Sequence, residues 1–173
     1  MKVIMILDQV QSGHGTKTDE MVPLTGVKEV IGPGVMMKPY LNEIDANIVA
    51  TLYCGTGTYL ENPSEVSRKF CAMVKKLKPD VVICGPALNY AEYASMCAKV
   101  AYDIVTTTDI KALAAMSIDN NETIEKYKDK IAIVRTPRKG EGGLRESLKN
   151  ICIVAKSLVD CIEIEDIKDK VCF

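Results

Sequence analysis

The feature that most constrains the fold is an alternation of short apolar runs with longer amphipathic stretches. Residues 2–7, 46–53 and 81–84 are β-rich apolar runs, typical of strands that are covered on both faces. Each run ends at glycine or polar residues, and the segment 62–78 then carries apolar residues at helical spacing. Strands that alternate with helices predict right-handed crossovers and a mostly parallel sheet.

The rest of the chain extends this pattern. The further predicted elements are strands at 104–107 and 131–134, helices at 89–102 and 143–159, a helical stretch with Leu113 and Met116, and irregular connections at 26–39 and 122–130. We therefore predict one α/β domain over residues 1–161, with a doubly wound, mostly parallel, Rossmann-like three-layer architecture. Residues 162–173 are interpreted as a final strand, an edge element or a tail used in assembly.

Ligands of such sheets bind beyond the carboxyl ends of the strands. In this chain, the loops predicted to gather there are 9–20, 54–61, 85–89 and 136–143. The working residues are expected in these loops.

Composition excludes several classes of protein. With 47% hydrophobic residues, 26% charged residues and a net charge of −1, the chain has the composition of a globular protein rather than of a nucleic-acid binder. The seven cysteines contain no C-x-x-C pair, which argues against a metal site, and their odd number argues against a disulfide framework. The apolar run 3–7 is too short for a signal peptide, and no stretch is long enough to cross a membrane. We expect a cytoplasmic protein.

Glycine motifs for nucleotides are incomplete. Gly13 and Gly15 follow the first strand, but Thr18 stands where a dinucleotide fingerprint needs its third glycine. In the loop 54–61, Leu60 occupies the corresponding position. A flavodoxin-like or nucleotide-binding protein therefore remains an alternative that rests on glycine content alone.

Two residues are candidates for catalysis. Cys54 ends a strand and faces a Gly-Thr-Gly turn, where backbone N–H groups or a helix N-terminus could lower the thiol pKa toward the thiolate. His14 is the only histidine and the only evident general base. The alternatives are a buried unreactive thiol and a solvated loop histidine.

Candidate binding residues follow the third strand and open the last helix. Asn89 and Tyr93 follow Gly85 and Pro86 at the start of a predicted helix, where an amide and a phenol can reach a small ligand. Arg145 opens the last helix, where its guanidinium can hold a carboxylate. The alternatives are a helix cap at Asn89 and a solvated charge at Arg145.

Taken together, four stretches resemble the selenoprotein B subunit, or component B, of the glycine, sarcosine and betaine reductases. The stretches are Gly32-Pro33-Gly34, Cys54-Gly55 with Glu61-Asn62, Gly85-Pro86-Ala87-x-Asn89 with Tyr93 and Cys97, and the final strand and helix with Arg145. The resemblance runs through nearly the whole chain in the right order, and the chain looks like the amino-terminal portion of that longer subunit.

The resemblance implies a function. Component B takes the amino-acid substrate, works with a pyruvoyl-containing partner subunit, and uses a selenocysteine to cleave the C–N bond reductively. By resemblance, the chain would bind a small amino acid or related carboxylate and would hold no cofactor of its own. The implied substrate-binding residues are Gly55, Asn62, Gly85, Pro86, Asn89, Tyr93 and Arg145, with Cys54 and His14 as candidates for catalysis.

The chain departs from the family in two places. The loop 12–16 carries a histidine and fewer glycines than the family pattern, and the family's selenocysteine lies further along than residue 173. We therefore expect no catalysis by this chain alone, and we expect it to act beside other reductase subunits. A different class of function stays open: an interaction module whose apolar helices and residues 162–173 pair subunits, including copies of this chain.

Overall fold

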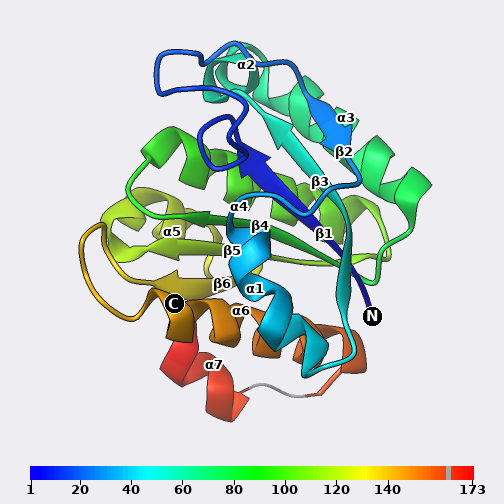
Figure 1. Cartoon of the computed structure of the whole chain (residues 1–173). Helices are drawn as coiled ribbons and strands as arrows, with labels where there is room; N and C mark the ends of the chain where they lie inside the picture. The colour runs from blue at the N-terminus through cyan, green and yellow to red at the C-terminus, as the bar shows by residue number, and fades with distance from the viewer. Residues whose placement is uncertain (163–164) are drawn as a thin grey trace.

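The chain forms a single sheet with helices on both faces (Figure 1). A computed structural model describes residues 1–162 and 165–173. Its strands are β1 (Lys2–Asp8), β2 (Thr25–Val27), β3 (Asn47–Cys54), β4 (Val81–Ala87), β5 (Lys111–Ser117) and β6 (Ala132–Thr136). Its helices are α1 (Pro33–Asn42), α2 (Thr56–Glu61), α3 (Pro63–Leu77), α4 (Ala91–Thr107), α5 (Asn121–Tyr127), α6 (Leu144–Asp160) and α7 (Glu165–Val171), with a 3₁₀ turn at Ile118–Asn120.

The strand order confirms the predicted fold class. The six strands lie in the order β2-β3-β1-β4-β5-β6. All neighbours pair in parallel except β2, which pairs antiparallel with β3. The five parallel strands thus follow the flavodoxin-like order 2-1-3-4-5. This order hosts many unrelated functions, so the function must be argued from the site.

The central strand β1 is buried on both faces, which explains its unbroken apolar sequence. Val3, Met5 and Leu7 face the core between the sheet and the helices α1 and α6. Ile4 and Ile6 face the core on the other side, together with α3 and α4. Successive side chains alternate between the two cores, so the position of a residue in a strand decides which layer it enters.

Two predicted elements in the middle of the chain are wrong. The β-branched run 104–107 is not a strand but the last turn of α4, where the hydroxyls of Thr107 and Thr108 donate to main-chain oxygens four residues back. The stretch with Leu113 and Met116 is not helical but forms β5, which is buried except at its first residue. Alanine favours a helix locally, but burial between β4 and β6 decides for the strand.

The predicted connections also contain regular structure. Residues 26–39 include most of β2 and the first turns of α1, whose first position is a proline, where a missing N–H costs nothing. The connector 122–130 begins within α5. The strand predicted at 81–84 is β4, which does not stop at Cys84 but passes through a bulge and ends at Ala87. Gly85, within this bulge, has φ = 115°, and an added Cβ would meet the Ala115 oxygen at 2.6 Å.

The end of the chain returns to the sheet. Residues 162–173 include the helix α7, which was not among the predicted alternatives of a strand, an edge element or a tail. Residues 163 and 164 lie outside the described part of the chain. Cys172 forms an isolated antiparallel bridge with Val134, and the Phe173 amide donates to the Ile133 oxygen at 3.0 Å. The division at residue 161 stays a prediction. None of the described helices is long and apolar enough to cross a bilayer.

The topology singles out one position at the carboxyl ends of the strands. From β1 the chain passes to β3 on one side, and it later enters β4 on the other side of β1. The connections after β1 and β4 therefore diverge, which leaves a crevice at this switch point. The loop after β1 and the start of α4 meet there.

Candidate functional site

A cavity of about 220 Å³ lies at the switch point. It is lined by Asp8, Gln9, Val10, Lys17, Glu20, Thr56, Tyr90 and Glu92. These residues come from the end of β1, the following loop, the start of α2 and the start of α4. The volume lies below the range of about 300–1,000 Å³ that is usual for drug-sized ligands, so the cavity suits a small molecule.

Asp8 is the buried charged group of this cavity. It is the last residue of β1, and its side chain is 2% exposed. Its Oδ1 accepts a hydrogen bond of 2.6 Å from the Gln11 amide, which closes the turn after the strand. Burial raises the pKa of Asp8, and backbone hydrogen bonds oppose that rise. Among the described residues, no cationic side chain forms an ion pair with it.

Gln9 joins the two loops that form the wall of the cavity. Its Oε1 accepts a hydrogen bond of 3.1 Å from the Thr56 amide, at the start of α2. Its Nε2 donates to the Thr16 oxygen at 3.5 Å. Because the side chain is 2% exposed, these bonds are shielded from water and hold the first two loops together.

The cavity lining also carries a positive charge. The Nζ of Lys17 lies 5.4 Å from the centre of the Tyr90 ring, within cation–π range. Tyr90 is the N-cap of α4, and no side chain caps this helix. The first amides of a helix without a side-chain cap favour a negative group nearby. The cavity lining thus combines a buried carboxyl with a cationic side chain.

Cys54 lies at the end of β3, but its environment is the reverse of the predicted one. Its side chain is fully buried, and burial raises the pKa of the thiol to about 11. The amides of the adjacent turn are occupied: that of Gly55 donates to the Val22 oxygen and that of Thr56 to Gln9. The predicted lowering of the Cys54 pKa is therefore wrong, because burial raises it and the adjacent N–H groups donate to other acceptors.

Alkylation should report this environment directly. Since the pKa rises from 9.0 to about 11, the Cys54 thiolate near pH 8 is about a hundredfold scarcer than that of an ordinary thiol. Iodoacetamide at pH 8, followed by mass spectrometry, is expected to label the exposed Cys161 and to leave Cys54 unmodified until the protein is denatured. Raising the pH toward 11 should speed labelling of Cys54. Equal labelling of both residues in the folded protein at pH 8 would contradict this account.

His14 lies on the other face of the sheet. Its ring stacks on Tyr53 with 4.3 Å between the ring centres, and its Nδ1 lies 3.0 Å from the Ser12 oxygen. Tyr53 belongs to the core on the side of α1 and α6, whereas Cys54 belongs to the core on the side of α3 and α4. The structure therefore does not bring the imidazole and the thiol together as a base and a nucleophile.

The binding residues predicted at the end of β4 and the start of α4 lie partly in the core and partly on the surface. Tyr93 is fully buried, and its hydroxyl donates to the Ile6 oxygen at 3.3 Å, so it supports the floor of the site from within the core. Gly85 and Pro86 are buried in β4, where they join through a cis peptide bond. Asn89 is exposed, and it does not cap α4, which begins after Tyr90.

The other predicted residues have structural contacts or lie apart from the cavity. An added Cβ on Gly55 would meet the Glu20 oxygen at 2.0 Å, so this glycine allows the loop after β1 to pack against α2. Asn62 caps α3: its Oδ1 accepts from the Glu65 amide at 3.1 Å. Arg145 is exposed in the first turn of α6 and does not line the cavity at the switch point.

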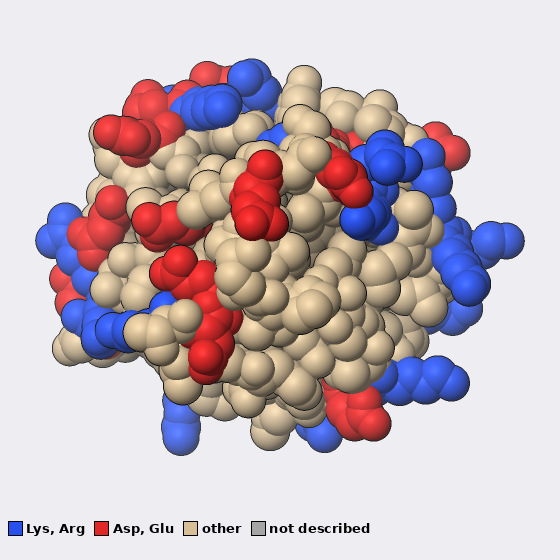
Figure 2. Space-filling model, turned by 90° about the horizontal axis from the view of Figure 1, so that it is seen from above, with Lys and Arg blue, Asp and Glu red and all other residues tan. Residues whose placement is uncertain are grey.

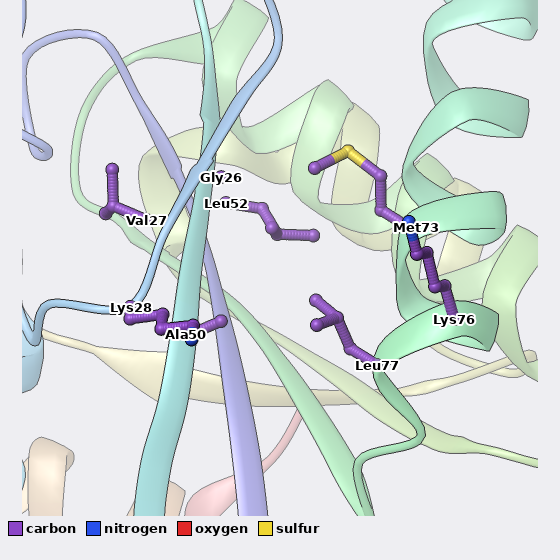
Figure 3. A pocket seen from close by; sticks show the side chains of 8 residues that line it. All are labelled: Gly26, Val27, Lys28, Ala50, Leu52, Met73, Lys76 and Leu77. Carbon is purple, nitrogen blue, oxygen red and sulfur yellow. The ribbon is translucent and has the colours of Figure 1, made fainter.

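Two other cavities differ in character. An open hollow of about 620 Å³ extends from Glu92 of α4 to the polar turn before α5, and it shares that glutamate with the switch-point cavity. A groove of about 300 Å³ lies beside the edge of the sheet (Figure 3). There Leu52 of β3 points toward Met73 and Leu77 of α3, so this groove has an apolar floor and offers little to a polar ligand.

Of the four loops expected at this edge of the sheet, 9–20 and 54–61 contribute to the lining of the cavity, whereas 85–89 and 136–143 do not. Asp8, Gln9, Lys17 and Glu92 line the cavity but are not among the residues predicted from the sequence. One signal was present: an acidic residue directly follows a buried run at the first strand of a doubly wound fold. Among the described residues, no group of three or more His, Cys, Asp or Glu side chains is placed to hold a metal ion.

Comparison with known proteins gives a consistent result. The family model described as glycine/sarcosine/betaine reductase selenoprotein B matches residues 1–171. The beta subunit of sarcosine reductase complex component B from Peptoclostridium acidaminophilum is 26% identical over 136 residues, which are 79% of this chain and 31% of that protein. No solved structure matches significantly.

Two further relatives are gamma subunits of glycine reductase complex component B. The one from Carboxydothermus hydrogenoformans is 29% identical over 134 residues, covering 78% of this chain and 30% of that protein. The one from Peptoclostridium litorale is 28% identical over 149 residues, covering 86% of this chain and 33% of that protein. This chain thus spans about a third of the length of the curated relatives that it matches.

Proposed function

Because the chain belongs to the family of the glycine/sarcosine/betaine reductase selenoprotein B, we propose that it acts as a component-B-type subunit of a reductase complex. In this proposal, the cavity at the switch point binds a small amino acid or a related carboxylate. The observation that carries it is the position of the cavity, at the carboxyl ends of the parallel strands, with Asp8 and Lys17 in its lining.

In this proposal, the chain binds the amino acid and orients it for the reaction. Gln9 and Thr56 fix the loops around the cavity, and Asp8 in its lining is shielded from bulk water. The 173 residues contain no selenocysteine, and the Cys54 thiol is protonated near neutral pH. We therefore assign the reductive cleavage of the C–N bond to groups outside these residues: a selenocysteine and a pyruvoyl group on a partner subunit.

Thermal unfolding tests the binding step. A ligand at a hundred times its Kd stabilises the folded state by about 2.7 kcal/mol. For a domain of this size, that corresponds to a rise in Tm of about 5–10 °C. We expect such a rise with at least one of glycine, sarcosine and betaine, and none with nucleotides. If no compound of this panel raises Tm, the proposed binding function is wrong.

Assembly is tested separately. We expect the chain to co-elute with the purified pyruvoyl-bearing subunit of a related complex in gel filtration, and the ligand to strengthen the association. A chain that binds the amino acid but never associates would retain the binding function and lose the assignment as a subunit.

A further inference from the structure

We propose that the switch-point cavity holds a zwitterionic ligand in one orientation, with its ammonium group against Asp8 and its carboxylate toward Lys17 and the first turn of α4. The inference rests on the proposed function and adds to it which end of the ligand each residue recognises. It assigns Asp8 a role in specificity that neither the family match nor the names of the relatives contain.

Asp8 has no cationic partner among the described residues. Taking a carboxylate out of water is costly unless an opposite charge or hydrogen bonds compensate for it. Asp8 has hydrogen bonds from backbone amides but no ion pair among the described residues, although its side chain is only 2% exposed. A cation in the adjoining cavity supplies the missing compensation and lowers the raised pKa of this carboxyl.

The charge around the cavity is mostly negative. Glu20 and Glu92 also line the cavity, so three carboxyl groups face a single lysine there. Figure 2 shows more acidic side chains from the centre to the left of its face, the side on which the strands end, and more basic ones toward the right. This field favours a cationic group inside the cavity.

The carboxylate of the ligand is placed near Lys17 and the start of α4. Lys17 lies over the Tyr90 ring, and Tyr90 directly precedes α4, whose N-terminus has no side-chain cap. A carboxylate beside Lys17 meets an ammonium group and the positive end of a helix of 17 residues, which outweigh the exposed Glu92 in the first turn of that helix. The lining therefore offers a group of each sign to the two charged groups of an amino acid.

The substitution Asp8→Asn isolates the charge. An asparagine keeps the side-chain oxygen that accepts the Gln11 amide, so the turn is preserved while the negative charge is lost. The control is Glu61→Gln, which removes one negative charge from an exposed position that does not line the cavity. Tm should be unchanged or higher in Asp8→Asn, because a buried charge without a counterion is removed.

Calorimetric titration gives the decisive comparison. For the wild-type chain, we expect glycine to bind at least tenfold more tightly than glycolate, which carries a hydroxyl in place of the ammonium group. In Asp8→Asn, glycine binding should weaken by about tenfold to a hundredfold, the range for a hydrogen bond to a charged group. Glycolate should bind as before, and Glu61→Gln should behave as the wild type.

The outcomes separate the two proposals. Equal wild-type affinities for glycine and glycolate would overturn the orientation, whatever happens to the variant, and so would full glycine affinity in a folded Asp8→Asn. Both results would leave the binding function intact. A wild-type chain that binds none of glycine, sarcosine and betaine would overturn the binding function and this inference with it.

Discussion

Replacing Tyr93 with alanine is expected to lower the free energy of unfolding by about 3–5 kcal/mol, the usual cost of removing a buried aromatic side chain. The Tyr93 ring is fully buried between the sheet and the helices α3 and α4. Its loss leaves a cavity under the end of β1 and also leaves the Ile6 oxygen without its hydroxyl donor. Urea-induced unfolding followed by circular dichroism measures the change.

The variant Tyr93→Phe separates packing from ligand contact. It keeps the ring and removes one hydrogen bond, so we expect a loss of about 0.5–1.5 kcal/mol in stability. Since the hydroxyl faces the Ile6 oxygen inside the core, the affinity for the amino acid should not change. A folded Tyr93→Phe that no longer binds sarcosine would contradict this placement and would restore the direct substrate contact predicted from the sequence.

Replacing Gly55 with alanine is expected to lower the free energy of unfolding by about 1–3 kcal/mol and to weaken ligand binding at the same time. The new Cβ would lie 2.0 Å from the Glu20 oxygen, a backbone atom that can move only with its loop. Glu20 and Thr56, on either side of this contact, both line the cavity. Chemical denaturation and calorimetric titration measure the two effects.

Gly142 offers the matched control. It lies in the exposed loop before α6, and an added Cβ there meets nothing within 4 Å. Gly142→Ala should therefore leave both stability and binding as they are in the wild type. Equal behaviour of the two variants would show that the close approach at Gly55 does not hold the loop after β1 in place.

The fold class could be predicted because burial leaves a direct mark on the sequence. Strands covered on both faces, such as β1, appear as unbroken apolar runs, and α3 shows its helical period and its asparagine cap. The errors occurred where local preference and tertiary context disagree. β5 has the alanine content of a helix and is a strand because it lies between two others.

The site was harder to predict than the fold, for a physical reason. The loops were identifiable because the carboxyl ends of parallel strands share one edge. The direction in which each side chain points could not be predicted, since it depends on the register of strand ends and on contacts between distant loops. Cys54 turns into the core, and Tyr93 fills it, while Asp8 and Lys17, nine residues apart, line the same cavity.

The central claim, that the switch-point cavity binds the amino acid, is tested most directly by amide NMR of the labelled chain during a titration with sarcosine. The account predicts saturable shifts that are largest for the amides of Gln9, Thr56 and Glu92, with the groove beside Leu52 and Met73 unaffected. Shifts centred on that groove, or no saturable shifts at all, would contradict it.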